Sequence, residues 1–170
     1  MRVLGIDPGT AITGYAVVEE NEGGSISLVT LGVINTPAKS PLPSRLQTIY
    51  NDLRKIIHTH QPDTSAVEQL FFSKNARTAM SVGHARGVTL LVLANAGLPI
   101  HEYTPMQIKQ AVTGYGGAKK AQIQEMVRLL LQLPYVPKPD DAADAAAVAI
   151  CYLHRAKMDG LLNAQDNSPA

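Results

Sequence analysis

Cysteine, tryptophan, charge and long apolar runs are all scarce in this chain of 170 residues. Its single cysteine, Cys151, cannot form a disulfide within the chain, so a disulfide-built scaffold is excluded and a reducing compartment is expected. No apolar run approaches the roughly 20 residues that a membrane helix needs. The first residues also lack the pattern of an export signal. We therefore expect a cytoplasmic protein that does not associate with membranes.

Charged residues make up only 17% of the chain, below the roughly 25% typical of globular proteins, whereas 45% of the residues are hydrophobic. This balance excludes intrinsic disorder and allows a substantial core. The length is that of one domain, and neither an internal repeat nor a long linker divides it. We expect one domain over residues 1–158 and a polar, flexible tail over residues 159–170.

The charges are segregated along the chain. Residues 70–139 hold 8 basic and 2 acidic side chains, whereas acids outnumber bases in the segments before and after them. A basic middle segment indicates a polyanionic partner such as nucleic acid. Solvated helix faces rich in lysine would explain the same pattern without any partner.

The apolar pattern predicts an α/β domain with a mixed sheet. Three strands joined by the turn Asn21–Gly24 form an antiparallel meander, and two later strands alternate with helices. The predicted strands are residues 2–7, 13–18, 25–34, 64–68 and 100–103. The predicted helices run from a Ser44–Gln47 capping box to about His60, over 75–95, from Pro105, over 119–131 and from Asp141 to about Lys157.

Four acids far apart in the sequence are the candidate catalytic groups. Asp7 and Glu68 each end a predicted strand, and the two strand ends meet if the strands are neighbours. Asp141 and Asp144 occupy the first turn of the last helix at i and i+3, hence on one face. That helix needs only to place its first turn across the strand ends for all four carboxylates to converge.

Each acid also has a purely structural interpretation. Asp7 begins an Asp-Pro-Gly turn, and Asp140 and Asp141 are typical of a helix N-terminus. Glu68 is harder to explain in this way, because it ends an apolar strand where an unpaired charge is costly. Asp144 lies among alanines and also needs a cation.

Hard oxygen ligands without His or Cys favour Mg²⁺ or Mn²⁺ over zinc. Four carboxylates balance the charge of two Mg²⁺ ions, and two such ions are the arrangement for in-line phosphodiester hydrolysis. The basic middle segment would bind the polyanionic substrate. Charge alone therefore indicates a metal-dependent nuclease.

The chain contains four motifs in this order: Gly5-Ile-Asp-Pro-Gly-Thr-Ala-Ile-Thr-Gly-Tyr15, Val67-Glu-Gln-Leu-Phe71, Ala85-Arg-Gly87 and Asp141-Ala-Ala-Asp144. These motifs and their order resemble the RuvC family of bacterial Holliday-junction resolvases. The resemblance implies an RNase H-like fold with a five-stranded mixed sheet flanked by helices. It implies symmetric paired nicks in strands of like polarity during recombination and repair. It matches Asp7, Glu68, Asp141 and Asp144 to the metal-binding acids, which would hold two Mg²⁺, with Mn²⁺ as a substitute.

Further positions carry over from the same resemblance. Lys109 and Lys120 match basic residues needed for cleavage, and Phe71 matches an aromatic residue that stacks on a base. We add to the DNA-binding set the neighbouring aromatic and basic residues, Phe72, Lys74, Arg77 and Lys119. Of the consecutive Phe71 and Phe72, one is expected inside and one outside. Asp140 leaves the register arguable, but the Asp-x-x-Asp spacing selects Asp141.

The resemblance also implies partners: four-way junction DNA, a second copy of the chain, and the RuvA and RuvB branch-migration proteins. The helix around Gly83 and Gly87 is the expected dimer contact. Two alternatives remain open from the sequence. An ATP-binding fold of the actin and sugar-kinase group also begins with Asp-x-Gly-Thr but needs a second domain, and a non-enzymatic junction-binding module would use the acids only as helix caps.

Overall fold

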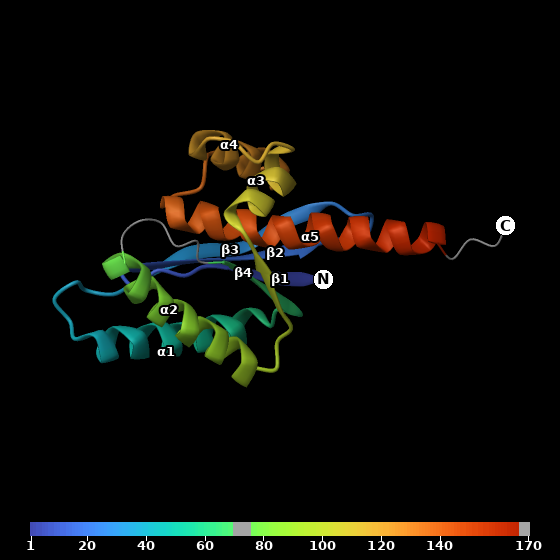
Figure 1. Ribbon diagram of the computed structural model, residues 1–170. Helices are drawn as coiled ribbons and strands as arrows, with labels where there is room; N and C mark the ends of the chain where they lie inside the picture. Colours follow the sequence, from blue (N-terminus) through green and yellow to red (C-terminus); the bar gives the residue numbers. More distant parts are fainter. Residues whose placement is uncertain (70–75, 167–170) are drawn as a thin grey trace.

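The protein is described by a computed structural model that covers residues 1–69 and 76–166, with the backbone alone for 76–79 and 160–166. A five-stranded sheet has helices on both faces (Figure 1). Helices α1 (Leu42–His60) and α2 (Ala76–Asn95) cover one face, and α3 (Pro105–Thr113), α4 (Lys120–Leu130) and α5 (Asp140–Asp166) lie on the other. Within this described part, no helix is both long and apolar enough to cross a membrane.

The sheet combines the antiparallel meander with two parallel strands, as the sequence predicts. Its order is β3-β2-β1-β4-β5. Strand β1 pairs antiparallel with β2 and parallel with β4, and β4 pairs parallel with β5. The strands are β1 (Arg2–Asp7), β2 (Ile12–Glu20), β3 (Ile26–Asn35), β4 (Thr64–Glu68) and β5 (Ile100–Tyr103).

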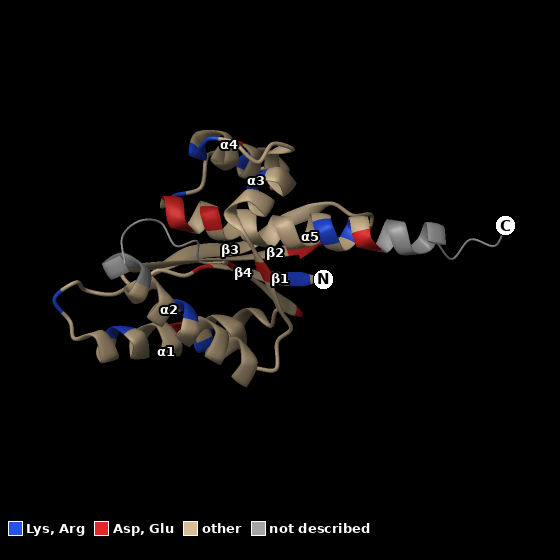
Figure 2. Cartoon of the chain, in the orientation of Figure 1, with Lys and Arg blue, Asp and Glu red and all other residues tan. Residues whose placement is uncertain are grey.

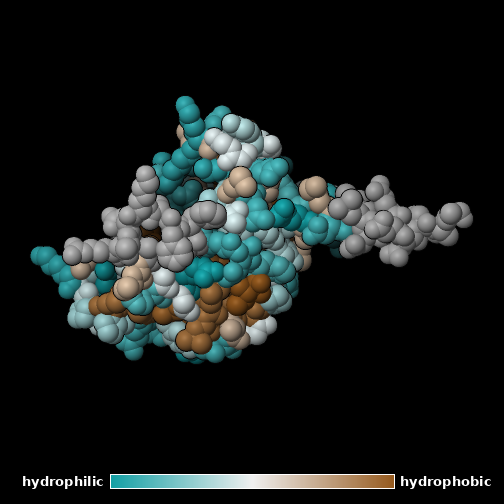
Figure 3. Space-filling model, viewed as in Figure 1, coloured by the Kyte–Doolittle hydropathy of each residue, from teal (hydrophilic) through white to brown (hydrophobic). Residues whose placement is uncertain are grey.

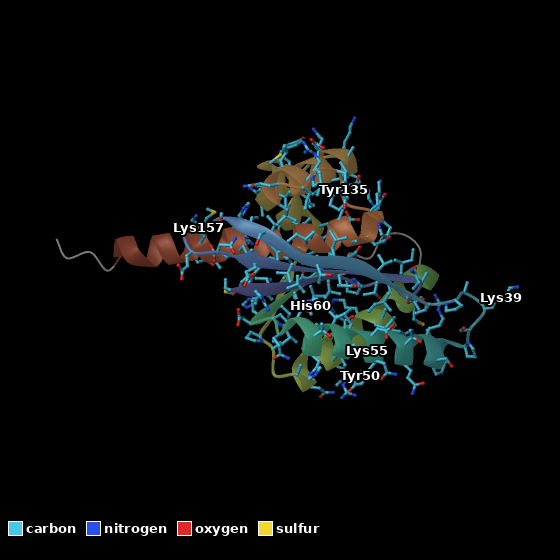
Figure 4. All side chains as sticks on the ribbon, turned by 180° about the vertical axis from the view of Figure 1, so that it is seen from behind. Lys39, Tyr50, Lys55, His60, Tyr135 and Lys157 are labelled. Carbon is cyan, nitrogen blue, oxygen red and sulfur yellow. The ribbon has the colours of Figure 1, made fainter. Side chains whose placement is uncertain are left out.

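Each face of the sheet has its own core. Alternate residues of β1 divide between them: Leu4 and Ile6 pack against α1 and α2, whereas Val3 packs beneath α5. The apolar stripe predicted for α1 is confirmed, with Ile49 and Leu53 completely buried. Seen from behind, the labelled residues of α1 and Lys157 of α5 lie on opposite sides of the sheet (Figure 4). Because helices cover both faces, the inner strands β1 and β4 are accessible only at their ends.

Two predicted helix boundaries are wrong. The Ser44–Gln47 capping box does not form, because α1 begins at Leu42 with Pro41 as its N-cap and no side-chain cap. Pro43 explains the earlier start, since a proline fits the first turn of a helix, where its missing N–H has no partner to lose. Helix α5 continues to Asp166, beyond the predicted end near Lys157. In contrast, the predicted helix start at Thr104-Pro105 is confirmed, and the structure adds a capping box between Thr104 and Gln107.

Candidate active site

Asp7 and Glu68 lie side by side at one edge of the sheet. The parallel pairing of β1 and β4 puts Ile6 opposite Val67, so the next residue of each strand is one of the two acids. Neighbouring strands are about 4.8 Å apart, which brings the two carboxyl groups within hydrogen-bonding reach. The predicted meeting of these strand ends is confirmed. Both strands end there, and Glu68 lines a small pocket.

Helix α5 approaches this edge closely because small residues line its contact with the sheet. A Cβ at Gly5 would lie 2.2 Å from the carbonyl oxygen of Ala145. A Cβ at Gly14, the partner of Asp7 in the β1–β2 pairing, would lie 2.0 Å from the carbonyl oxygen of Asp141. The absence of side chains at both glycines therefore lets the first turns of α5, with Asp141 and Asp144, lie over the ends of β1 and β2.

Negative charge accumulates around Asp7. Burial, followed by the charges of Glu68 and Asp144 and a smaller contribution from Asp141, raises the pKa of Asp7 to about 8. Burial also raises the pKa of Glu68, although the hydrogen bond with Asp7 opposes that rise. A buried carboxyl with so high a pKa is typical of functional sites, because a buried acid with a structural role is normally paired with a cation or a hydrogen-bond donor. The charges of Glu68, Asp141 and Asp144 therefore all act on Asp7.

Two lysines border the acids on the α3 and α4 side. Lys109 and Lys120 each lower the pKa of Glu68 by their charge. Together with Glu68 and Asp144 they line a pocket of about 290 Å³. The pocket thus presents ammonium and carboxylate groups to the same small volume. Such a mixture suits a phosphate diester, whose negative charge the ammonium groups attract.

Lys120 forms an ion pair with one of the acids. Its Nζ lies 3.0 Å from Oδ2 of Asp144 and 3.5 Å from Oδ2 of Asp140. Figure 2 shows the acidic start of α5 near the basic start of α4. Among the described side chains, no three of the Asp, Glu, His and Cys type are grouped as a ready metal cage. The ammonium of Lys120 is the cation that Asp144 contacts in this arrangement.

Comparison with known proteins identifies the family. The profile of the family described as crossover junction endodeoxyribonuclease RuvC matches residues 3–152. The chain belongs to the RuvC family. The RuvC proteins of Chloroflexus aggregans and Heliobacterium modesticaldum are 61% and 57% identical over 92% and 91% of this chain, which correspond to 94% of each relative.

Solved structures of RuvC agree with the fold. Thermus thermophilus RuvC in complex with Holliday junction substrate has a TM-score of 0.85 and 34% identity, covering 93% of this chain and 96% of the other. A second Thermus thermophilus RuvC structure has the same TM-score, with 36% identity over 94% and 97% of the two chains. The RNase H-like fold expected from the sequence is therefore confirmed.

The RuvC-type DNA-contact residues are covered only in part. Phe71, Phe72 and Lys74 lie outside the described residues, so the expected inside-outside arrangement of the two aromatics stays a prediction. Arg77 belongs to the first turn of α2, and its side chain is also outside the description. Lys119 is exposed and adjoins Lys120 at the start of α4.

Sequence reasoning missed two features of this RuvC site. Asp140, set aside by the Asp-x-x-Asp spacing, contacts Lys120 and also Lys138, whose Nζ lies 2.8 Å from its Oδ1. Gly14 was quoted only as part of a motif, yet it determines how closely α5 can approach. Both signals were visible as an extra acid and a strand glycine, but Lys120, which contacts Asp140, and Asp141, which lies over Gly14, are distant from them in sequence.

Proposed function

We propose that Asp7, Glu68, Asp141 and Asp144 are the active site with which this crossover junction endodeoxyribonuclease hydrolyses phosphodiester bonds at four-way DNA junctions. The family membership and the likeness to a RuvC bound to Holliday junction substrate support the substrate. The observation that carries the site is the pKa of Asp7, raised to about 8 by burial and by the other three acids. An acid whose charged form is so strongly disfavoured by its neighbours would be stabilised by a bound cation.

The RuvC family is metal-dependent, and the side chains present here fit a divalent cation. All four acids offer hard oxygen ligands, which favours Mg²⁺, with Mn²⁺ as a substitute. Asp7, Glu68, Asp141 and Asp144 would hold two ions between them, matching their total charge. When bound, such ions supply an activated water and stabilise the leaving oxygen. The role of the protein is to hold the four carboxylates close together, which it does by packing α5 against the sheet.

The two pocket lysines act on the substrate phosphate. Lys109 and Lys120 reach the acids from α3 and α4, opposite the strand ends. An ammonium group in this position holds the scissile phosphate and stabilises the negative charge that grows during hydrolysis. Positions next to the site extend the DNA contact: we assign base stacking to Phe71 and backbone contacts to Phe72, Lys74, Arg77 and Lys119.

An apolar surface on α2 is the proposed dimer contact. Met80 and Leu91 are 69% and 53% exposed on this helix. Apart from the nearby backbone of α2 itself, no described atom lies within 4 Å of a Cβ placed on Gly87, which falls between them in sequence. Figure 3 shows an apolar patch over this region. A second copy packed here would present two sites to a two-fold junction.

Two symmetric sites explain the outcome of the reaction. One nick leaves the joined duplexes connected, whereas paired nicks in strands of like polarity separate them and leave 5′-phosphate and 3′-hydroxyl ends. Junction shape and deformability supply most of the selectivity, and base contacts near the cut select the sequence. The RuvA and RuvB branch-migration proteins are the proposed protein partners.

Strand cleavage tests the function. A mobile four-way junction and a linear duplex of the same sequence are incubated with the protein in Mg²⁺ and in EDTA. Paired nicks confined to the junction and to Mg²⁺ are expected. Junction binding without cleavage would point instead to a binding module, and equal cutting of the linear duplex would indicate an unselective nuclease.

A further inference from the structure

We propose that Asp140 is a positioning residue that keeps Lys120 beside the active site when Asp144 binds a divalent cation. The inference rests on the proposed function, because it concerns the same reaction. It adds a role for an acid that the Asp-x-x-Asp motif leaves out. Asp140 does not belong to the metal-binding set.

The ammonium of Lys120 has two carboxylate neighbours on one helix face. Asp140 and Asp144 are four residues apart at the start of α5, so their side chains lie one above the other. Nζ of Lys120 is 3.0 Å from Oδ2 of Asp144 and only slightly farther, 3.5 Å, from Oδ2 of Asp140. A small rotation of the lysine side chain exchanges one acceptor for the other.

The two acceptors differ in their surroundings. The side chain of Asp144 is 26% exposed and faces the acidic cluster, whereas that of Asp140 is 44% exposed and lies outside it. A divalent cation on Asp144 repels the ammonium of Lys120 and competes for the same carboxylate, which weakens the Lys120–Asp144 ion pair. Lys120 then loses its nearer partner, and Asp140 is the remaining carboxylate that keeps its ammonium at the pocket.

Lys138 keeps Asp140 in this supporting position. Its Nζ lies 2.8 Å from Oδ1 of Asp140, so both oxygens of Asp140 face ammonium groups. Asp140 therefore joins the starts of α4 and α5 and the preceding loop. A carboxylate engaged in this way acts on Lys120 and not on a metal ion.

A set of variants tests this assignment. With Asp140→Asn, the single-turnover cleavage rate should fall about tenfold, because the ammonium of Lys120 is no longer held in position next to the substrate phosphate. Junction affinity and the Mg²⁺ concentration for half-maximal rate should stay within about twofold, since neither depends on Asp140. Asp140→Glu should recover most of the rate. Asp52→Asn removes an acid paired with Lys55 on α1, far from the site, and is the matched control.

The decisive comparison uses a variant without the lysine. In a Lys120→Met background, Asp140→Asn should cause no further loss, because the two residues act as one unit. An undiminished additional loss, or rescue of Asp140→Asn by excess Mg²⁺, would overturn the proposal. The first result would show an independent structural role, and the second would make Asp140 a metal ligand.

A metal-free measurement separates this proposal from the proposed function. Acetylation of each lysine is followed by peptide mass spectrometry in EDTA in an Asp144→Asn background, which removes the nearer acceptor without a metal, with the exposed neighbour Lys119 as the internal reference. Adding Asp140→Asn should raise the reactivity of Lys120 about threefold relative to Lys119, because its ammonium loses the remaining carboxylate acceptor. Unchanged reactivity would refute the proposal. Failure of the wild-type protein to cleave junctions would refute the proposed function and leave this result intact.

Discussion

Gly14 of β2 lies beneath Asp141 of α5 so closely that a Cβ on the glycine would be 2.0 Å from the carbonyl oxygen of the aspartate. In the β1–β2 pairing, Gly14 is also the partner of Asp7. One glycine therefore determines the separation between an acid of the sheet and an acid of the helix. The relative position of these two acids depends on a residue with no functional group.

Gly14→Ala tests that dependence. The added methyl group must push α5 away from the sheet, because the atom it meets is backbone. We expect the free energy of unfolding to fall by about 1–3 kcal/mol. Cleavage should fall by at least about tenfold even where the protein is fully folded, since small misplacements of reacting groups are costly. Urea unfolding and single-turnover cleavage at low temperature measure the two effects.

Gly116→Ala is the matched control for the packing argument. Its Cβ would approach Cγ of Met106 to 3.0 Å, and that side chain is 65% exposed and flexible enough to move. The free energy of unfolding should change by less than about 0.5 kcal/mol. Equal destabilisation by the two substitutions would contradict the special role of Gly14.

The metal-free protein should lose stability as the pH rises. Asp7 binds its proton more tightly in the folded protein, where its pKa is about 8, than in the unfolded chain, where it is near 3.8. The contribution of the protonated acid is complete below about pH 4 and disappears as the pH passes through 8. Burial raises the pKa of Asp144 in the same direction.

Urea unfolding in EDTA at pH 5, 7 and 9 checks this expectation. The wild type should lose at least about 1 kcal/mol between the ends of that range, and Asp7→Asn should lose much less. Mg²⁺ at pH 8 should restore stability to the wild type, because a ligand that binds only the folded state stabilises it. A wild-type curve as flat as that of Asp7→Asn would show that Asp7 is not strained by its neighbours.

Leu91→Glu tests the proposed dimer. Leu91 is 53% exposed on α2, and a charge there would be buried against the same helix of a second copy. Light scattering should show a dimer for the wild type and a monomer for the variant, with the variant still folded. Leu129→Glu on α4, at 51% exposure, is the matched control and should stay dimeric. Loss of the dimer in both variants, or in neither, would reject the α2 contact.

The local part of this fold could be predicted from the sequence. The short apolar runs that end in Asp7 and Glu68 and the Thr104-Pro105 helix start all formed where the pattern placed them. The start of α1 was wrong, because Pro43 competes with the Ser44 cap for the first turn. Such competition between two valid helix starts depends on packing that a local pattern does not contain.

The site could be predicted as a set of acids but not as a geometry. Parallel strand ends brought Asp7 and Glu68 together for a reason visible in the sequence. The approach of Asp141 over Gly14 and the contact of Lys120 with Asp140 and Asp144 join elements that are distant along the chain. The packing of α4 against α5 determines which acid Lys120 contacts, and that packing cannot be predicted from composition or local pattern.

The most direct test of the acidic site is Asp7→Asn on a four-way junction. Binding is measured by gel shift in Ca²⁺ or EDTA, and cleavage is measured by single-turnover kinetics in Mg²⁺, both beside the wild type. The variant should bind the junction within about twofold of the wild type, because Asp7 contributes no positive charge to the DNA contact. Its cleavage should fall by at least about 100-fold. Cleavage at the wild-type rate would contradict the assignment of Asp7, and with it the proposed carboxylate site.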